Sequence, residues 1–364
     1  MKKLTIFLTT MAVGLAGIIS NSYAAADPPM AYATDARLSL SASEMANAKS
    51  RMPMLTDASQ LPAEVRANLG IGDGGQVSAG FGTGNHPFTT KRASTRQAPA
   101  NTLRRFPYRA AGQLYMTFGA SNFICSGAVI DRRVVVTAAH CVHNFGQEGA
   151  GFADAVSFKP VRHKGAAQFG TFTGSTWTVP QPYYDGTDVC TTAGVVCEND
   201  IAIVLMADNG GVAIGDAIGG QVSTYGTAQN GYSYTSFLGE QATHVTQLGY
   251  PGSFDSAQQM QRNDSLGYQA TPSNVIIGSD MTGGSSGGPW IANFGVNPVS
   301  TSSAPTQNIA NRVIATTSWG FVSDAIKVQG ASRFAHNTYF TAPGQTNIEN
   351  LYQFICSLDP GNCY

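Results

Sequence analysis

Hydrophobic positions form short runs from residue 106 to the end of the chain, and turn residues separate one run from the next. The runs are a few residues long and rich in Val, Ile, Leu and aromatic side chains. Such runs between Gly, Asn, Asp and Ser are typical of β-strands. Many short strands at frequent intervals indicate an all-β fold of the barrel or sandwich type. We predict strands at 113–118, 123–130, 134–137, 202–206, 245–248, 275–277, 290–291 and 313–317.

The clearest helical pattern lies near the C-terminus. Thr346 and Glu349 have the spacing of a capping box, in which each side chain bonds the other residue's backbone N–H. Three apolar residues then recur on one face of the expected helix: Ile348, Leu351 and Ile355. We therefore predict an amphipathic helix after the last strand.

The stretch before residue 106 has a different composition. Residues 42–52 and 61–69 are rich in Ala, Met, Glu and Leu and are predicted to be partly helical. Residues 70–105 hold mainly Gly, Thr, Ser and basic residues with little periodicity, which indicates a linker. This linker ends in Arg104-Arg105, which is either a processing point or an exposed basic turn.

The first 26 residues have the pattern of an export signal. Lys2-Lys3 supplies a positive start, residues 4–19 are mostly apolar, and small residues follow at 22–26. The alternative is a membrane anchor, but the apolar run is short and cleavage residues follow it directly. The mature protein is expected to be periplasmic or extracellular, without a membrane anchor. The predicted divisions are a signal peptide at 1–26, a pro-segment and linker at 27–105 and the main domain at 106–364.

Composition and charge agree with export. Hydrophobic residues make up 43% of the 364 residues and charged residues only 12%, which suits a large core and a secreted all-β domain. The formal net charge is −1, so nothing points to nucleic-acid binding. Residues 27–105 carry nine Lys/Arg and six Asp/Glu, whereas 106–364 carry ten and sixteen. The two parts should attract each other, as a removable segment and its own domain would.

The six cysteines form three local pairs along the sequence. Six cysteines allow fifteen connectivities, so this pairing is an inference from proximity. Disulfides require an oxidising compartment, in agreement with export. The sequence has no Cys-x-x-Cys or His-Glu-x-x-His pattern, and we expect neither a metal nor another cofactor. The pairs are Cys125/Cys141, Cys190/Cys197 and Cys356/Cys363.

Three polar residues stand in contexts that suit nucleophilic catalysis. Ser286 lies in the sequence Gly-Gly-Ser-Ser-Gly-Gly-Pro, where glycines let the backbone approach closely and present the hydroxyl. His140 follows an apolar run, and Asp200 precedes one. The chemistry needs a hydroxyl, an imidazole to accept its proton and a carboxylate to hold the imidazole tautomer. Each residue alone has an ordinary structural explanation, but all three in this order are far less expected by chance.

The motifs around these residues resemble those of the trypsin/chymotrypsin-like serine peptidases, and most of all the secreted bacterial members. The resemblance covers about residues 106–364 and includes the two cysteines that bridge the histidine region. It implies two six-stranded antiparallel β-barrels with the site between them, and a monomeric enzyme that acts on proteins or peptides. The matching motifs are Cys125-Ser126-Gly127, Thr137-Ala138-Ala139-His140-Cys141, Asn199-Asp200-Ile201-Ala202, Gly284-Ser285-Ser286-Gly287-Gly288-Pro289 and Thr317-Ser318-Trp319-Gly320.

The resemblance also implies a role for each matched residue. Ser286 would be the nucleophile, His140 the general base and then acid, and Asp200 the residue that orients His140. The backbone N–H groups of Gly284 and Ser286 would form the oxyanion hole. The substrate backbone would pair in β fashion with three residues: Ser318, Trp319 and Gly320.

One departure from the family concerns activation of the zymogen. Family members usually carry Asp just before the nucleophile, and in trypsin-type zymogens this Asp pairs with the newly freed N-terminal ammonium. Here that position is Ser285, and no Arg or Lys followed by Ile or Val is found near Phe106. We therefore expect the pro-segment at 27–105 to be a partner of the domain. Removal of this pro-segment is not expected to create that ion pair.

A second departure concerns the substrate pocket. Asp280 lies six residues before Ser286, where trypsin-like enzymes carry the carboxylate that selects Arg or Lys. It points to a basic P1 residue, and the alternative is a turn or surface carboxylate. Thr282 replaces a cysteine that frames the pocket, and the loop 293–311 is longer and polar. Glutamate-selective relatives are expected to carry His at the position of Thr317, so the P1 preference stays open.

Two other functions compete with this interpretation. The Gly-x-Ser-x-Gly pattern around Ser286 also fits the nucleophile elbow of an α/β-hydrolase esterase, with Asp324 and His336 as partners. However, the Gly-Gly-Pro that follows is a poor helix start, and the βαβ rhythm of that fold is absent. The other alternative is an exported peptidase-like domain that binds without cutting, and the complete triad argues against it.

Overall fold

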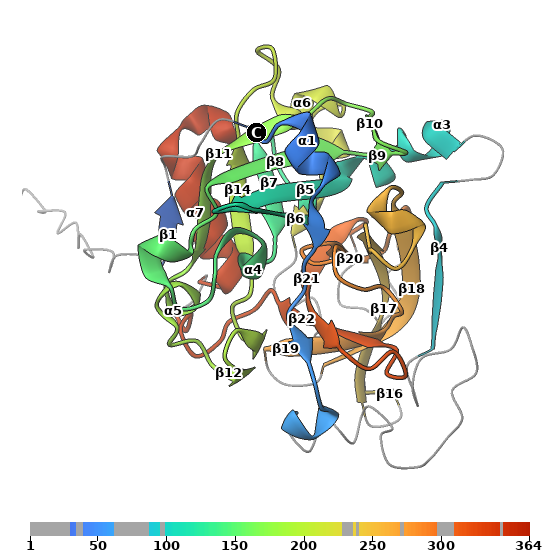
Figure 1. The fold of residues 1–364 in the computed structure, drawn as a ribbon, viewed down its shortest axis with the longest axis vertical. Helices are drawn as coiled ribbons and strands as arrows, with labels where there is room; N and C mark the ends of the chain where they lie inside the picture. The colour runs from blue at the N-terminus through green and yellow to red at the C-terminus, as the bar shows by residue number, and fades with distance from the viewer. Residues whose placement is uncertain are drawn as a thin grey trace, which may run out of the picture.

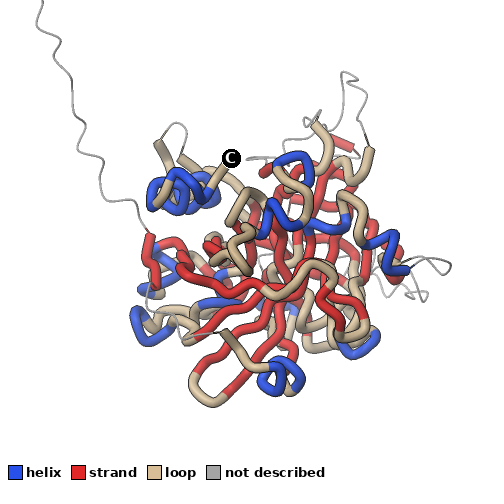
Figure 2. The backbone as a smooth tube through the Cα atoms, turned by 90° about the horizontal axis from the view of Figure 1, so that it is seen from above, coloured by secondary structure: helices blue, strands red, loops and turns tan. Residues whose placement is uncertain are grey.

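The structure is a computed structural model of the chain, and its two β-barrels lie side by side (Figure 1). Strands dominate the backbone, and most helices are short and lie at the periphery (Figure 2). The prediction of two six-stranded antiparallel barrels with a C-terminal helix is confirmed. The described residues are 30–33, 39–61, 87–94, 99–227, 236–237, 240–269, 273–296, 309–342 and 345–364.

The first barrel is closed by six antiparallel strands. Hydrogen-bonded neighbours follow the order β5-β6-β7-β14-β11-β8, and β8 pairs back to β5. Four of the eight predicted strands lie here. The bounds are β5 (Ala111–Phe118), β6 (Ser121–Val129), β7 (Val134–Thr137), β8 (Ala155–Pro160), β11 (Phe172–Pro180) and β14 (Ala202–Met206).

The second barrel has the same number of strands and is closed in the same way. Its neighbours follow the order β17-β20-β21-β22-β19-β18, and β18 pairs back to β17. The other four predicted strands lie here. The bounds are β17 (Glu240–Gly249), β18 (Gln261–Gln269), β19 (Asn274–Gly278), β20 (Pro289–Ala292), β21 (Arg312–Phe321) and β22 (Val328–Arg333).

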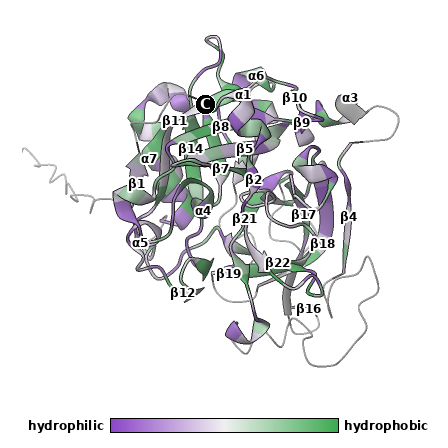
Figure 3. Cartoon of the chain, in the orientation of Figure 1, coloured by the Kyte–Doolittle hydropathy of each residue, from purple (hydrophilic) through white to green (hydrophobic). Residues whose placement is uncertain are grey.

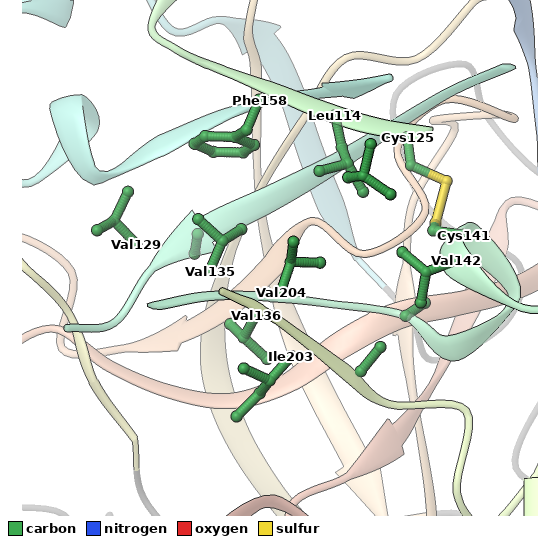
Figure 4. Packing of buried hydrophobic residues seen from close by; sticks show 14 of the residues in the cluster. Leu114, Cys125, Val129, Val135, Val136, Cys141, Val142, Phe158, Ile203 and Val204 are labelled. Carbon is green, nitrogen blue, oxygen red and sulfur yellow. A yellow bond between two sulfur atoms is a disulfide. The ribbon is translucent and has the colours of Figure 1, made fainter. Parts of the chain in front are cut away.

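Apolar side chains fill the interior of each barrel. Figure 4 shows side chains of β5, β7, β8 and β14 gathered around one interior, with the Cys125–Cys141 disulfide at its edge. In the second barrel a separate cluster includes Val245, Ile277 and Trp290. Hydrophobic residues concentrate in the barrel strands in Figure 3. Burial of this kind drives the closure of both sheets, because each strand removes apolar surface from water.

The predicted C-terminal helix is present as α7 (Asn347–Leu358). The Thr346 hydroxyl caps it by accepting a hydrogen bond from the Glu349 N–H at 3.2 Å. Ile348, Leu351 and Ile355 are all fully buried, as their spacing predicted. The helix packs on β11 and β14 and so covers the outside of the first barrel.

The remaining elements are short and connect or cover the barrels. Within the described part of the chain, no helix is both long enough and apolar enough to cross a membrane. The helical elements are α4 (Ala139–Val142), α5 (Gln181–Asp185), α6 (Ile214–Ala217), η2 (Tyr108–Ala110), η3 (Glu148–Gly151), η4 (Gln221–Ser223), η5 (Asp255–Ala257) and η6 (Pro360–Asn362). The short strands are β9 (Arg162–His163), β10 (Ala166–Ala167), β12 (Cys190–Thr192), β13 (Val195–Cys197), β15 (Gly226–Thr227) and β16 (Ser236–Phe237).

The three disulfides join the local pairs that the sequence predicts. Cys125–Cys141 links β6 to α4, Cys190–Cys197 links β12 to β13, and Cys356–Cys363 links α7 to the chain beyond it. The first of these bridges matters most for the site, because α4 carries His140.

The segment before residue 106 packs on both barrels. β1 pairs antiparallel with β11, and β4 pairs antiparallel with β18. β2 and β3 pair parallel with β6 and β21. The predicted attraction between the two parts is visible in two ion pairs, Lys91–Asp264 at 2.8 Å and Arg92–Asp255 at 2.5 Å. The elements are β1 (Met30–Ala33), α1 (Ala42–Ala46), β2 (Lys49–Ser50), β3 (Met54–Leu55), η1 (Ala58–Gln60), β4 (Phe88–Arg92) and α3 (Pro99–Leu103).

One expectation for this segment was wrong in part. The stretch 42–52, predicted to be partly helical, forms α1 over its first five residues, and the residues after α1 pair with barrel strands. The stretch 70–105, predicted to be a linker, contains β4 and α3, so tertiary pairing overrides its weak local pattern. The predicted signal peptide at 1–26, and all but the first residue of the helix predicted at 61–69, lie outside the described residues.

Candidate active site

The structure brings His140 and Asp200 together. His140 lies on α4 directly after β7, and Asp200 directly precedes β14, which pairs with β7. The ring Nδ1 of His140 lies 2.8 Å from Asp200 Oδ2, and the His140 backbone N–H donates to Oδ1 at 2.8 Å. Both side chains are buried. This arrangement holds the imidazole in one orientation and favours the tautomer with its proton on Nδ1.

Asp200 has a third partner that the sequence did not indicate. The Ser318 hydroxyl, on β21 of the second barrel, donates to Asp200 Oδ2. The Asp200 backbone N–H in turn donates to Ser332 Oγ at 3.2 Å. Ser318 was predicted only as part of the strand that pairs with substrate. Its hydroxyl also joins the two barrels at the carboxylate, so three donors reach one buried Asp.

Ser286 lies on the loop that precedes β20. Gly284 and Gly287 have φ values of +96° and +73°, a region that a side chain rarely adopts. A Cβ on Gly287 would also meet Thr137 Oγ1, so only glycine permits this approach to the first barrel. The Ser126 N–H donates to the Ser286 carbonyl at 2.7 Å and ties the loop to β6. The two glycines therefore place Ser286 against the strand that leads to His140.

The structure does not join Ser286 to His140 by a hydrogen bond. Ser286 is 0% exposed, and its Oγ has no hydrogen-bond partner among the described residues. The free ring nitrogen of His140, Nε2, lies 3.6 Å from Cys141 Sγ. Hydrogen bonds between nucleophile and base are often long without substrate and tighten in the reactive complex.

The predicted oxyanion-hole donor at Gly284 already has a partner. Its backbone N–H donates to the carbonyl oxygen of Arg51 at 3.1 Å. Arg51 belongs to the segment between β2 and β3. A carbonyl from the N-terminal part of the chain thus accepts from the N–H that was predicted to polarise a substrate carbonyl.

The strand predicted to pair with substrate also pairs with this segment. Gly320 and Phe321 of β21 lie opposite Met54 and Leu55 of β3. The Gly320 N–H donates to the Pro53 carbonyl at 3.2 Å. Ser318 and Trp319 are buried, and the Trp319 indole N–H donates to Asn274 Oδ1 at 3.2 Å.

Asp280 has a different neighbour from the one that a basic pocket would require. Its Oδ1 accepts a hydrogen bond from the Thr90 hydroxyl on β4 at 2.5 Å. The residue is only partly buried. Thr282, two residues on, accepts from the Ser253 N–H at 3.0 Å. Both side chains are engaged with other parts of the fold, and loop 293–311 lies largely outside the described residues.

A buried polar network lies beside the loop that carries Ser286, and no sequence pattern singled it out. The Gln329 Oε1 accepts from Gln247 Nε2 at 2.6 Å and from Ser279 Oγ at 3.0 Å. Gln247 also donates to Thr317 Oγ1 at 2.9 Å. These contacts fix the orientation of the Gln329 amide, so its Nε2 donates to Ser285 Oγ at 3.1 Å. A polar residue between apolar ones in a short strand was the signal that could have found it.

Ser285 is therefore tied into the site by neutral contacts. Its hydroxyl donates to the Thr282 carbonyl at 2.8 Å while it accepts from Gln329.

Two titratable residues near the site have displaced pKa values. Burial raises the pKa of Asp188 to about 7, although Asn199, next to Asp200, donates two opposing hydrogen bonds to it. Burial lowers the pKa of His143 to about 4, and the hydrogen bond to the Glu148 carbonyl opposes this shift. His143 is therefore neutral at ordinary pH and serves as a packed residue beside the α4 turn.

Two further kinds of feature could in principle bind a ligand: clusters of metal-ligating side chains, one of which includes His140, and a cavity. In the described part of the chain, two groups of His, Cys and Asp side chains lie close enough to hold a metal. Each includes a disulfide, whose sulfurs offer no thiolate to an ion. A cavity of about 450 Å³ lies beside Phe106, the first residue of the main domain. Its lining also includes Asp131, Tyr225, Arg312 and Tyr352.

Comparison with known proteins agrees with the geometry. A family model described as Trypsin matches residues 97–335. The chain belongs to the trypsin family. Glutamyl endopeptidase of Bacillus licheniformis is 26% identical over 186 residues, which make up 50% of this chain and 49% of that protein. An extracellular metalloprotease of Bacillus subtilis is 33% identical over 72 residues, 19% of this chain and 22% of that one.

The solved structures support the fold of this trypsin-family chain. Thermostable serine protease AL20 from an extremophilic microorganism superposes with a TM-score of 0.52 at 19% identity. The match covers 69% of this chain and 98% of that one. The chain spans about half the length of the glutamyl endopeptidase and about a fifth of the metalloprotease. Two antiparallel barrels also exclude the α/β-hydrolase alternative, in which Asp324 and His336 would complete a triad.

Proposed function

We propose that the protein is a serine endopeptidase with His140, Asp200 and Ser286 as its catalytic triad. The observation that carries this proposal is the pair of 2.8 Å contacts between Asp200 and His140. The conformation of the loop that carries Ser286, which requires glycine on both sides, adds support. A domain that only binds peptides has no need to bury an Asp under three donors to orient one imidazole.

The proposed reaction gives each of these groups one role. Ser286 Oγ attacks the carbonyl carbon of the peptide bond while His140 Nε2 accepts the hydroxyl proton. The N–H groups of Gly284 and Ser286 stabilise the oxyanion, and each such donor contributes about 10²–10³ in rate. His140 then gives the proton to the leaving amine as the C–N bond breaks. Water, deprotonated by His140, hydrolyses the acyl-enzyme and restores Ser286.

The P1 preference follows from the amide of Gln329. This donor lies where the pocket is expected, on the side of β22 that faces Gly320. An N–H donor suits a P1 side chain that ends in an acceptor, such as Gln, Glu or Met. The relative from Bacillus licheniformis is a glutamyl endopeptidase, which is consistent with an acceptor-ended side chain. The basic preference expected from Asp280 is less favoured, since that carboxylate contacts Thr90.

The wider setting is also part of the proposal. The chain is exported, carries a signal peptide at 1–26 and a pro-segment at 27–105, and acts as a monomer on protein or peptide substrates outside the cytoplasm. Support comes from the disulfides, from the ion pairs between β4 and the domain, and from a relative that is an extracellular protease.

Cleavage of a mixed-peptide library tests this function. The processed protein is compared with a Ser286→Ala variant, and products are read by mass spectrometry. We expect cuts after acceptor-ended residues and none from the variant. An active Ser286→Ala protein would remove Ser286 as the nucleophile.

A further inference from the structure

Residues 49–55 cross both barrels and pass directly over the triad. This segment is the blue stretch below α1 in Figure 1, which runs past β6 and β21. Lys49 and Ser50 pair with β6 of the first barrel, and Met54 and Leu55 pair with β21 of the second. A peptide segment of the same chain therefore covers the proposed active site.

Arg51 is held on both sides at the centre of this segment. Its N–H donates to the Ile124 carbonyl at 3.2 Å, and its carbonyl accepts from Gly284 at 3.1 Å. Its guanidinium donates to Asn144 Oδ1 at 2.7 Å and lies 4.4 Å from the centre of the Phe118 ring. Backbone and side chain together place one carbonyl on the oxyanion-hole donor.

The residues after Arg51 occupy the substrate side of the site. Gln329 Nε2 lies 3.5 Å from the Met52 sulfur, and a Cβ on Gly320 would lie 3.0 Å from the same atom. Met52 therefore lies between β21 and β22. The Pro53 carbonyl accepts from Gly320 and the Leu55 carbonyl from Val322, at 3.2 and 2.9 Å.

The direction of the segment is opposite to that of a cleavable substrate. β21 passes Ser286 at Thr317, whose backbone bonds Gly287 and Gly288, and then runs away from it. A substrate whose residues before the scissile bond pair with β21 must run toward Ser286, antiparallel to β21. The segment runs parallel to β21. In a substrate one residue supplies both the carbonyl in the hole and the side chain in the pocket. Here Arg51 supplies the carbonyl and Met52 the side chain.

Apolar side chains anchor the segment beyond the site. Leu55, Ala58 and Leu61 are buried against the second barrel, and each is less than 8% exposed. They form one cluster with Trp319, Phe321 and other apolar residues. On the other side, Leu40 and Met45 beside and on α1 are buried in the hydrophobic cluster of the first barrel. The segment is therefore fixed at both ends of its passage over the triad.

We propose that residues 49–55 are an inhibitory strand, which fills the active site in reversed direction and so blocks it without being cut. This inference rests on the proposed function. The occupant of the site is the chain's own pro-segment, and activity requires that the strand be released.

The first test measures the reaction of Ser286 with a fluorophosphonate probe in chains that still carry residues 27–105, identified by mass. Leu55→Asp places a charge in the apolar anchor and should release the strand. We expect labelling about tenfold faster or more, because reactivity follows the population of the open site. Gln60→Asp, at an exposed position five residues beyond Leu55, is the matched control and should label like wild type.

A locked variant keeps the proposal testable if Leu55→Asp fails to fold. A Cβ on Gly252 would lie 3.3 Å from the Ser50 Cβ, close to the separation of about 3.5–4.5 Å in a disulfide. Ser50→Cys with Gly252→Cys should therefore fix the strand on the site. Labelling should be slower than in wild type and rise with a mild reductant that leaves wild type and the Ser50→Cys variant unchanged.

The outcomes separate this inference from the proposed function. If chains from which residues 27–105 have been removed by limited proteolysis do not label, the serine peptidase assignment fails. If those chains label, but the unprocessed and locked chains label equally fast, only the inhibitory strand is overturned. Cleavage at Arg51–Met52 or Met52–Pro53 by the enzyme itself would overturn the reversed direction.

Discussion

Asp200 accepts two hydrogen bonds from His140, one from the backbone N–H and one from ring Nδ1, each 2.8 Å long. The pair lies within the first barrel, and the Ser318 hydroxyl from the second barrel adds a third bond. A carboxylate can accept all three because both oxygens are acceptors. The orientation of His140 therefore depends on the charge state of Asp200 and on the docking of the two barrels.

Asp200→Asn should retain the fold and abolish most activity. An amide has one acceptor oxygen and cannot serve all three donors, so the wrong imidazole tautomer is favoured. We expect kcat to fall by about 10⁴. The measurement is peptide turnover with circular dichroism as a check of folding. Asp216→Asn, a surface carboxylate paired with Arg132, is the control and should change kcat little. A loss of less than about tenfold would contradict the role of Asp200.

Gln329→Glu should change the P1 preference. Glu has nearly the same shape, and one of its oxygens can still accept from Gln247 and Ser279. The other oxygen replaces the N–H donor with a charged acceptor. We expect the ratio of kcat/KM for a P1 Lys substrate to that for a P1 Gln substrate to rise by about 10–100-fold. The Lys substrate gains a charge-assisted hydrogen bond, and the Gln substrate loses a donor. Peptides that differ only at P1 measure the ratio.

The control for this substitution is Gln221→Glu on exposed η4. It adds the same charge away from the triad and should leave the ratio unchanged. An unchanged ratio in Gln329→Glu as well would place the P1 determinant elsewhere, with Asp280 as the first alternative.

His143 should make the protein sensitive to acid. Burial lowers its pKa in the folded protein to about 4, below the ordinary value of 6.5. Above pH 6.5 both folded and unfolded chains carry neutral His143, and the full stability is present. As the pH falls from 6.5 toward 4, the unfolded chain binds a proton that the folded chain does not. The free energy of unfolding should fall by about 2 kcal/mol between pH 7 and pH 5 from this residue.

Urea unfolding at pH 7 and pH 5 measures this effect. The background is Ser286→Ala, which prevents self-digestion. His143→Gln should reduce the loss of stability between the two pH values, while His244→Gln, at an exposed position, should not. Equal losses in all three chains would show that His143 does not carry the acid sensitivity.

Strands and motifs were predictable because their signals are local. The runs 134–137, with three Val, and 202–206, apolar throughout, became β7 and β14, which pair with each other. The C-terminal helix was predictable for the same reason, since its cap and its apolar face lie within one short stretch. Local signals were weakest between 42 and 105, where 42–52 could be predicted only as partly helical and β4 was missed.

By itself the sequence determined the alternation of apolar runs and turns, the local pairs of cysteines, and three chemically suited residues in the order His, Asp, Ser. Only the tertiary structure decided which side chains meet. It turned Asp280 toward Thr90, oriented Gln329 through Gln247 and Ser279, and placed Arg51 on Gly284. The partners in each case lie 50 to 233 residues apart, and strand pairing and barrel docking bring them together. Such contacts depend on the packing of whole barrels and leave no periodic trace in the chain.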